Sequence, residues 1–250
     1  MKVLPNSGDP QAAVLREYTR LASEYDSRWS FYVNATVHET MRRLEVRPGD
    51  KVLEIGCGTG ALLASLRRAH PGVQLTGVDP CAEMLKQARA KVGPAVELVE
   101  AWAEWLPFDD EQFDVVVLCN VFHYLQHPRE ALAQIARVLR RGGRLVITDW
   151  CDDYFACKVC DLFLRLFNAS HQKTYGSAQC VRLLAEANFA GVRLERYKID
   201  WFWGLMAATA QKPATPAAAG GVRAKDGFAQ RLRAFWRPAP ALAQAFSRAG

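Results

Sequence analysis

Residues 52–60 read VLEIGCGTG, an apolar run that leads into three glycines separated by single residues. The run belongs to a predicted strand over Lys51–Ile55, and the apolar spacing of Ala61–Ala69 predicts a helix directly after the glycines. In such a turn a ligand can approach the backbone N–H groups closely, and the helix dipole favours negative charge. The stretch therefore predicts an α/β unit with a ligand site at the carboxyl end of its strand.

The same alternation of strand and helix continues along the chain. Further strands are predicted over 74–78, 96–99, 113–118 and 144–148, and further helices over 81–91 and 128–139. The alternation predicts an α/β fold with a doubly wound, mostly parallel sheet. Two later apolar segments, 192–199 and about 202–210, raise the predicted number of strands to seven. Arg141, Gly142 and Gly143 are expected to end the helix before the fifth strand.

Three regions are expected from these patterns. Residues 1–45 carry apolar positions at helical spacing and predict an N-terminal helical lid. The α/β domain is expected over 46–212, with an insertion on the substrate side at 151–176. The low-complexity sequence KPATPAAAGG opens a tail, 213–250, that is expected to be flexible.

The net charge of +6 originates in this tail. Residues 212–250 hold seven basic side chains and one acid, whereas residues 1–211 hold 25 of each. On charge grounds the body of the chain is therefore not expected to bind nucleic acid. The segment GFAQRLRAFWR predicts a basic amphipathic helix, so that residues 223–246 could contact an anionic membrane, cover their own domain or fray.

The composition predicts a cytoplasmic protein. The N-terminal sequence MKVLPNSGDPQ has no apolar run long enough for a signal peptide, and no stretch approaches the ~20 apolar residues of a membrane span. The seven cysteines are odd in number and scattered, which favours a reducing compartment over a disulfide framework.

Asp79 ends the second predicted strand, 19 residues after Gly60. A carboxylate at that position can accept hydrogen bonds from both hydroxyls of a ribose, so the glycine turn and Asp79 together predict an adenosine-containing cofactor. The glycines alone do not identify that cofactor, because GCGTGA (56–61) also fits the G-x-G-x-x-A fingerprint of dinucleotide-binding proteins.

Four stretches decide between these cofactors. VLEIGCGTG (52–60), GVDP (77–80), AEWLPFDDEQFDVVVL (103–118) and IARVLRRGGRLVITDW (135–150) occur in order. Together they resemble the motifs of the class I S-adenosylmethionine-dependent methyltransferases, particularly the small-molecule group related to the ubiquinone and menaquinone biosynthesis enzymes. The resemblance covers about 18–212 and implies the Rossmann-like methyltransferase fold, S-adenosyl-L-methionine as cofactor and a small organic acceptor.

The resemblance also implies a set of cofactor contacts. The methionine end would be held by Glu54, Gly56, Cys57, Gly58 and Gly60, and the ribose by Asp79. The adenine would be flanked by Pro80 and Met84, with Trp102, Ala103 and Glu104 at its edge. Asn120 would lie beside the sulfonium, and Tyr18 and Tyr25 of the lid would close over the cofactor.

Trp102 departs from the family pattern. It stands where the family often has an aspartate that accepts the adenine amino group. An indole can stack but cannot accept a hydrogen bond. Recognition of the adenine amino group is therefore expected to rely on backbone or on Glu104.

Methyl transfer needs a nucleophile in line behind the sulfonium, and a base only where that nucleophile carries a proton. His123 follows the fourth predicted strand and is interpreted either as a group that serves as base or orients the acceptor, or as a hydrogen-bonded structural histidine. Tyr175, at the end of the insertion, is the second candidate catalytic residue, and Asp149, Tyr154 and His171 are further expected contacts of the acceptor.

The insertion leaves two other functions open. Cys151, Cys157, Cys160 and His171 could bind a metal or hold arsenite, as in the thiol-using arsenite methyltransferases, but the spacing lacks a second cysteine pair and no metal site is predicted. The other hypotheses are a cofactor-binding module without catalysis and a dehydrogenase.

Overall fold

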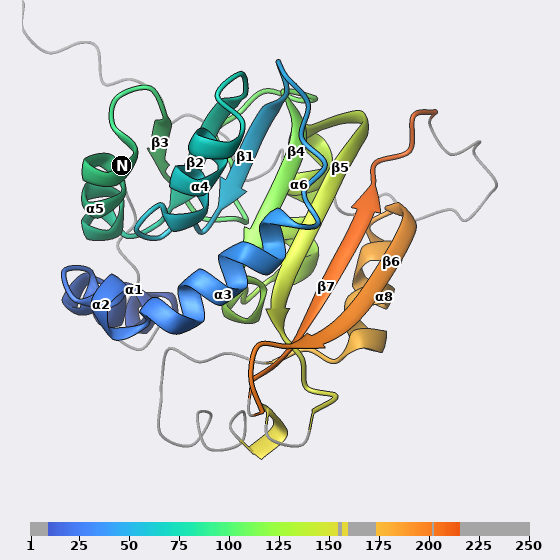
Figure 1. The fold of residues 1–250 in the computed structure, drawn as a ribbon. Helices are drawn as coiled ribbons and strands as arrows, with labels where there is room; N and C mark the ends of the chain where they lie inside the picture. Colours follow the sequence, from blue (N-terminus) through green and yellow to red (C-terminus); the bar gives the residue numbers. More distant parts are fainter. Residues whose placement is uncertain (1–9, 155–156, 160–173, 202, 216–250) are drawn as a thin grey trace, which may run out of the picture. The chain divides into compact units, whose positions relative to one another are not determined.

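A seven-stranded sheet with the strand order β3-β2-β1-β4-β5-β7-β6 lies at the centre of the protein (Figure 1). The computed structural model describes residues 10–154, 157–159, 174–201 and 203–215, all of which belong to the unit Met1–Pro216. The strands are β1 (Lys51–Ile55), β2 (Gln74–Asp79), β3 (Glu97–Glu100), β4 (Phe113–Cys119), β5 (Leu139–Trp150), β6 (Ala190–Lys198) and β7 (Gly204–Gln211).

The sheet is mostly parallel, as the alternation of strands and helices predicts. The pairs β1–β2, β1–β4, β2–β3 and β4–β5 are parallel, and β7 is antiparallel to both β5 and β6. After β3 the chain returns to the other side of β1, so the strand order reverses between β1 and β4. Open parallel sheets bind ligands at the carboxyl ends of the strands at such a reversal.

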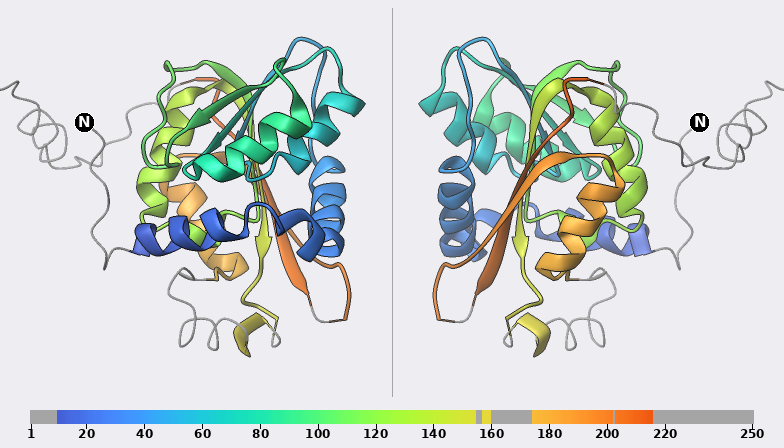
Figure 2. Two further views of the ribbon diagram at one scale, coloured as in Figure 1. Left: turned by 90° about the vertical axis from the view of Figure 1, so that its left-hand side faces the viewer. Right: turned by 90° about the vertical axis from the view of Figure 1, so that its right-hand side faces the viewer.

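Helices cover both faces of the sheet. Helices α3, α4 and α5 pack on one face, and α6 and α8 pack on the other (Figure 2). This explains why the apolar run of β4 is continuous, because a strand buried on both faces has no solvent side. The helices are α1 (Pro10–Leu21), α2 (Tyr25–Arg28), α3 (Ser30–Met41), α4 (Ala61–Ala69), α5 (Ala82–Val92), the 3₁₀ turn η1 (Phe122–Tyr124), α6 (Pro128–Val138) and α8 (Ser177–Glu186).

The expectation that Arg141, Gly142 and Gly143 end a helix is wrong. Helix α6 ends at Val138, and β5 begins at the next residue. The pairing with β4 shifts register before Arg144, and Gly142 takes a left-handed φ of 69° in the irregular stretch. The glycines therefore allow a local irregularity within β5. There the backbone N–H of Gly142 donates a hydrogen bond to the carbonyl of Lys212 at 2.9 Å.

The N-terminal helices lie at the carboxyl edge of the sheet. There α1 and α2 lie beside the ends of the parallel strands, while α3 continues onto the face of the sheet (Figure 1). Thr40 of α3 shares a 2.6 Å hydrogen bond with Thr148 of β5, and both side chains are buried. The lid is thus continuous with a helix that belongs to the packed body.

Several expectations fall on residues outside this description. Cys160 and His171 lie in 160–173, and the predicted amphipathic helix lies in 216–250. Within the described ranges, no helix is long and apolar enough to cross a membrane.

We expect Ile147→Ala in β5 to lower the free energy of unfolding by about 2–5 kcal/mol, because it leaves a cavity in a close-packed layer. Ile147 is fully buried and pairs with Leu118 of β4 and Ala208 of β7. Urea denaturation followed by circular dichroism measures the change. Val181→Ala on α8, where the side chain is 38% exposed, is the control and should change stability by about 0.5 kcal/mol or less. Equal stabilities of the two variants would contradict the packing described here.

Candidate functional site

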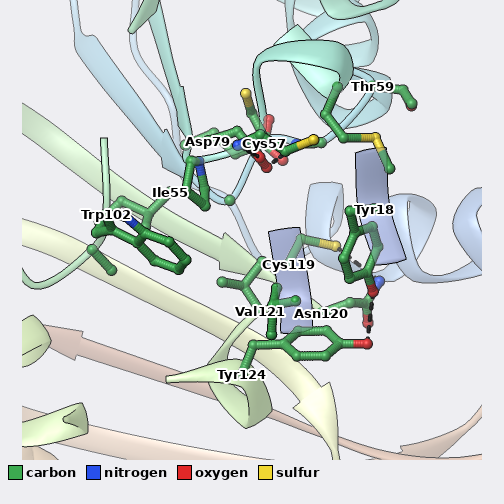
Figure 3. Close-up of a pocket in the computed structure, with 18 of the residues that line it drawn as sticks. Tyr18, Ile55, Cys57, Thr59, Asp79, Trp102, Cys119, Asn120, Val121 and Tyr124 are labelled. Carbon is green, nitrogen blue, oxygen red and sulfur yellow. Dashed lines mark hydrogen bonds between the residues drawn. The ribbon is translucent and has the colours of Figure 1, made fainter. Parts of the chain in front are cut away.

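A cavity opens at the carboxyl ends of β1 and β4, beneath the N-terminal helices (Figure 3). It encloses about 1090 Å³ including its open mouth. The walls come from the glycine loop after β1, the end of β2, the loop after β3, the end of β4 and the lid. The site therefore lies where the strand order reverses.

Three left-handed glycines shape the loop after β1. The φ angles of Gly56, Gly58 and Gly60 are 68°, 50° and 77°. A Cβ on Gly56 would lie 2.3 Å from Val121, and one on Gly60 would lie 3.1 Å from the Cβ of Ala88. A Cβ on Gly58 would meet nothing within 4 Å. Gly56 and Gly60 are thus required by close packing, whereas Gly58 borders open space in the cavity.

Asp79 connects the end of β2 to this loop. Its carboxylate accepts the backbone N–H of Gly58 and that of Cys81, both at 2.9 Å. Burial raises the pKa of Asp79 to about 6, although the two backbone hydrogen bonds act in the opposite direction. The carboxyl group therefore titrates near neutral pH while it holds the loop.

Two further carboxyl groups in the cavity wall have an unsatisfied oxygen. The Oε2 atoms of Glu54 and Glu104 are buried and have no hydrogen-bond partner. Burial, together with the nearby Asp79, raises the pKa of Glu54 well above its usual range, and burial also raises that of Glu104. A buried acceptor without a donor is costly, so these atoms mark places where a ligand with N–H groups would be stabilised.

Tyrosines form the wall next to the end of β4. The Tyr18 hydroxyl donates to the Tyr124 hydroxyl at 2.6 Å, and the two rings pack edge to face (Figure 3). Tyr25 packs against Tyr18 with ring centroids 5.9 Å apart. Burial raises the pKa of Tyr25 to about 12, so its phenol stays neutral at physiological pH.

Asn120 directly follows β4 and has a left-handed backbone with φ 60°. Its side chain is held from α3: the Tyr32 hydroxyl donates to Oδ1 and Nδ2 donates to Thr36, both at 2.8 Å. Its backbone N–H donates to the carbonyl of Thr148 at 2.8 Å. Sparsely populated backbone conformations of this kind persist where surrounding contacts enforce them, and they concentrate at functional sites.

His123 and Tyr175 lie behind the cavity wall. His123 is buried, and the carboxylate of Asp149 binds its Nδ1 at 2.6 Å and accepts its backbone N–H at 3.0 Å. The His123 ring lies 4.0 Å from that of Tyr124, which does line the cavity. Tyr175 is buried against Phe122 with ring centroids 4.8 Å apart.

Most of the predicted cofactor residues meet in this cavity. Those that line it are Tyr18, Tyr25, Glu54, Gly56, Cys57, Gly58, Asp79, Pro80, Met84, Trp102, Ala103, Glu104 and Asn120. Gly60, His123 and Tyr175 are outside the lining, Gly60 because it packs against α5. Sequence reasoning missed Cys119, Val121 and Tyr124, which lie around Asn120 beyond the end of the fourth predicted strand.

The described cysteines of the insertion have local partners. The Cys151 thiol lies 3.5 Å from the Ser177 hydroxyl, and the Cys157 thiol donates to the carbonyl of Gly204 at 3.2 Å. Within the part of the chain that the structure describes, no three His, Cys, Asp or Glu side chains are grouped to hold a metal ion.

Comparisons with known proteins extend these observations. Residues 53–147 match the family described as "Methyltransferase domain". A phosphatidylethanolamine N-methyltransferase of Cereibacter sphaeroides is 37% identical over 142 residues, which are 55% of this chain and 68% of that protein. An O-methyltransferase of Aspergillus sclerotiorum is 36% identical over 120 residues, which are 46% of this chain and 45% of that protein.

A solved structure shows the same fold at lower identity. A chain in the complex of the Haloferax volcanii Trm112 methyltransferase activator with a methyltransferase superposes with a TM-score of 0.70 and 21% identity, over 79% of this chain and 98% of that chain. Several curated relatives are longer proteins, of which this chain spans between 32% and 45%.

The pKa of Asp79 generates a prediction about stability. A carboxyl group whose pKa rises from 3.8 to about 6 on folding stabilises the folded state below the lower value, and this contribution is lost as pH rises through the higher one. At about 1.4 kcal/mol for each pKa unit, the stability of the wild type relative to Asp79→Asn should fall by about 3 kcal/mol between pH 3 and pH 7. Urea denaturation across this range tests it, and a rising difference would contradict the raised pKa.

Proposed function

The chain belongs to the class I S-adenosylmethionine-dependent methyltransferases, and on that premise we propose that it transfers the methyl group of S-adenosylmethionine to a small organic acceptor. The observation that carries the proposal is the buried, unpartnered Oε2 of Glu54 beside a glycine loop at the reversal of the strand order. This arrangement suits a ligand that brings both an ammonium group and an anionic end.

The residues present fit the cofactor at its methionine and ribose ends. The Glu54 carboxylate would accept N–H bonds from the methionine ammonium, and this cation would return the pKa of Glu54 toward its usual range. Gly58 borders open space, so the loop backbone can be approached there. Asp79 would accept the ribose hydroxyls while it retains its bonds to the loop.

The adenine would lie between β2 and the loop after β3. Pro80 and Met84 would flank the base, and the indole of Trp102 would pack at its edge. The unpartnered Oε2 of Glu104 supports the proposal that this carboxylate accepts the adenine amino group, in place of the aspartate that Trp102 replaces. Ala103 contributes backbone to the same edge.

The cofactor, when bound, supplies an electrophilic methyl group that a nucleophile displaces in line. The protein contributes positioning and the exclusion of water, which in well-oriented reactions lower the barrier by about 7–11 kcal/mol. Asn120, held rigidly by Tyr32 and Thr36, would fix the methionine side of the site. Tyr18 and Tyr124 close the cavity at the same end.

His123 and Asp149 are the proposed proton-handling pair. We assign the hydrogen bond between them to the Nδ1–H of His123 as donor and the Asp149 carboxylate as acceptor. In this tautomer Nε2 carries no proton, as a base requires. Because Tyr124 separates the ring from the cavity, His123 would act on an acceptor that enters beside Tyr124. Burial, together with the nearby Asp149, raises the pKa of Tyr175 to about 12, and we assign this tyrosine a supporting role.

The acceptor atom is a matter for experiment, since the named relatives include both an N- and an O-methyltransferase. A screen of small metabolites with a labelled methyl donor identifies it. A cytoplasmic location and membrane contact through 223–246 stay predictions of the sequence.

S-adenosylhomocysteine, but not NAD, should bind the protein in calorimetry. Glu54→Gln should weaken this binding about 10- to 100-fold, because it removes a charge-assisted hydrogen bond to the ammonium group. The exposed Glu130→Gln, the same chemical change on α6, should leave the affinity unchanged. Binding of NAD without S-adenosylhomocysteine would favour a dehydrogenase, and S-adenosylhomocysteine binding without transfer to any acceptor would favour a non-catalytic module.

His123→Ala should lower turnover at saturating cofactor by about 100-fold or more with an acceptor whose nucleophile carries a proton. The affinity for S-adenosylhomocysteine should not change, because His123 lies outside the cavity lining. The melting temperature should also fall, because Asp149 loses its buried partner. Unchanged turnover would leave His123 a structural residue.

A further inference from the structure

Asp26 joins the lid to the glycine loop. From helix α2, its Oδ1 accepts the Thr59 hydroxyl at 2.6 Å and its Oδ2 accepts the Lys91 ammonium of α5 at 2.6 Å. Lys91 also donates to the Thr59 hydroxyl oxygen at 3.1 Å, so the three side chains form a closed triangle. We call Asp26, Thr59 and Lys91 the lid clamp. It connects three elements that are distant in sequence.

Helix α2 depends on polar contacts of this kind. It has only four residues, Tyr25–Arg28, of which Tyr25 is half-buried and the other three are exposed. Its N-cap residue Glu24 makes no side-chain capping bond. A helix so short is not stable by itself, and little apolar burial holds this one in place. The carboxylate of Asp26 therefore supplies directional anchoring that the apolar contacts of α2 do not.

The clamp also acts on the loop that contacts the proposed cofactor. Thr59 is buried and stands between Gly58 and Gly60, both of which have left-handed backbones. Figure 3 shows Thr59 on the opposite side of the pocket from Trp102. The loop is thus held from two sides, by Asp79 through the Gly58 N–H and by Asp26 through the Thr59 hydroxyl.

The neighbour of Asp26 forms part of the cavity wall. Tyr25 lines the cavity and packs on Tyr18, which bonds Tyr124 at the far end of the lid. Two adjacent residues of α2 thus have different contacts: the ring of Tyr25 lies in the cavity wall, and the carboxylate of Asp26 binds the glycine loop. Any displacement of Asp26 would move Tyr25 with it.

We propose that Asp26 is a positioning residue for cofactor binding, which holds the lid and the glycine loop in the arrangement that retains S-adenosylmethionine. The proposal rests on the proposed function and goes beyond it. Asp26 is not itself a predicted cofactor contact and would act through Thr59, to which it is bonded, and through its chain neighbour Tyr25. Release of the cofactor then requires the clamp to open.

The solvent exposure of the lid clamp determines how much it is expected to slow cofactor release. The side chains of Lys91 and Asp26 are 30% and 49% exposed, so the ion pair by itself is partly screened by solvent. The bond to the buried Thr59 adds to it. We therefore expect loss of the clamp to speed cofactor release about five- to tenfold, and the ionic part to be sensitive to salt.

The test is the rate at which labelled S-adenosylhomocysteine leaves the full-length protein after addition of excess unlabelled compound. Asp26→Asn and Asp26→Ala should release it about five- to tenfold faster than the wild type, and Asp26→Glu should restore part of the difference. Lys91→Gln should have a similar effect, and the double variant Asp26→Asn, Lys91→Gln should be no faster than the stronger single variant. Raising the salt concentration should speed release from the wild type but not from the double variant.

Glu24→Gln is the matched control, since it removes the same charge two residues away from Asp26 and should leave the release rate unchanged. Melting temperatures identify any variant that fails to fold, in which case the salt dependence of the wild type decides. Release rates of folded Asp26 variants within twofold of the wild type, or a wild-type rate that does not respond to salt, would overturn the proposal. A wild-type protein that binds no S-adenosylhomocysteine would instead overturn the proposed function and, with it, this role of Asp26.

Discussion

The hydrogen bond from the Gly58 N–H to the Asp79 carboxylate is the contact on which the site depends. It joins the loop after β1 to the end of β2, and a second bond from the Cys81 N–H joins the same carboxylate to the start of α5. Three left-handed glycines at alternate positions would otherwise give the loop wide conformational freedom. With the loop held in this way, Glu54 and Asn120 reach the same cavity from the two strands at which the sheet order reverses.

The electrostatics of the cavity follow from its burial. Glu54, Asp79 and Glu104 all have raised pKa values, because carboxyl groups are removed from water in one cavity wall. The unpartnered oxygens of Glu54 and Glu104 are costly until donors reach them. A cofactor that carries ammonium and amino groups would supply those donors, so the carboxyl groups that are costly to bury would favour its binding.

The N-terminal helices join the site by polar contacts at separate strand ends. Tyr18 bonds Tyr124 after β4, Tyr32 bonds Asn120 at the end of β4, and Asp26 bonds Thr59 after β1. Each contact joins a side chain of the N-terminal helices to a loop that lines the cavity. Polar contacts suit a cover that has to open, because their exchange with water costs less than exposure of an apolar face.

The sequence by itself determined the strand and helix order, the glycine loop and the place of Asp79 at a strand end, because these follow from local periodicity and from glycines next to a strand end. It did not reveal the irregularity at Gly142 and Gly143, where strand pairing overrode the usual end of a helix. Tertiary structure alone decided that His123 lies behind Tyr124 against Asp149, and that Asp26 meets Thr59. Such contacts join residues far apart in the chain, and no local pattern encodes which side chains the folded sheet will bring together.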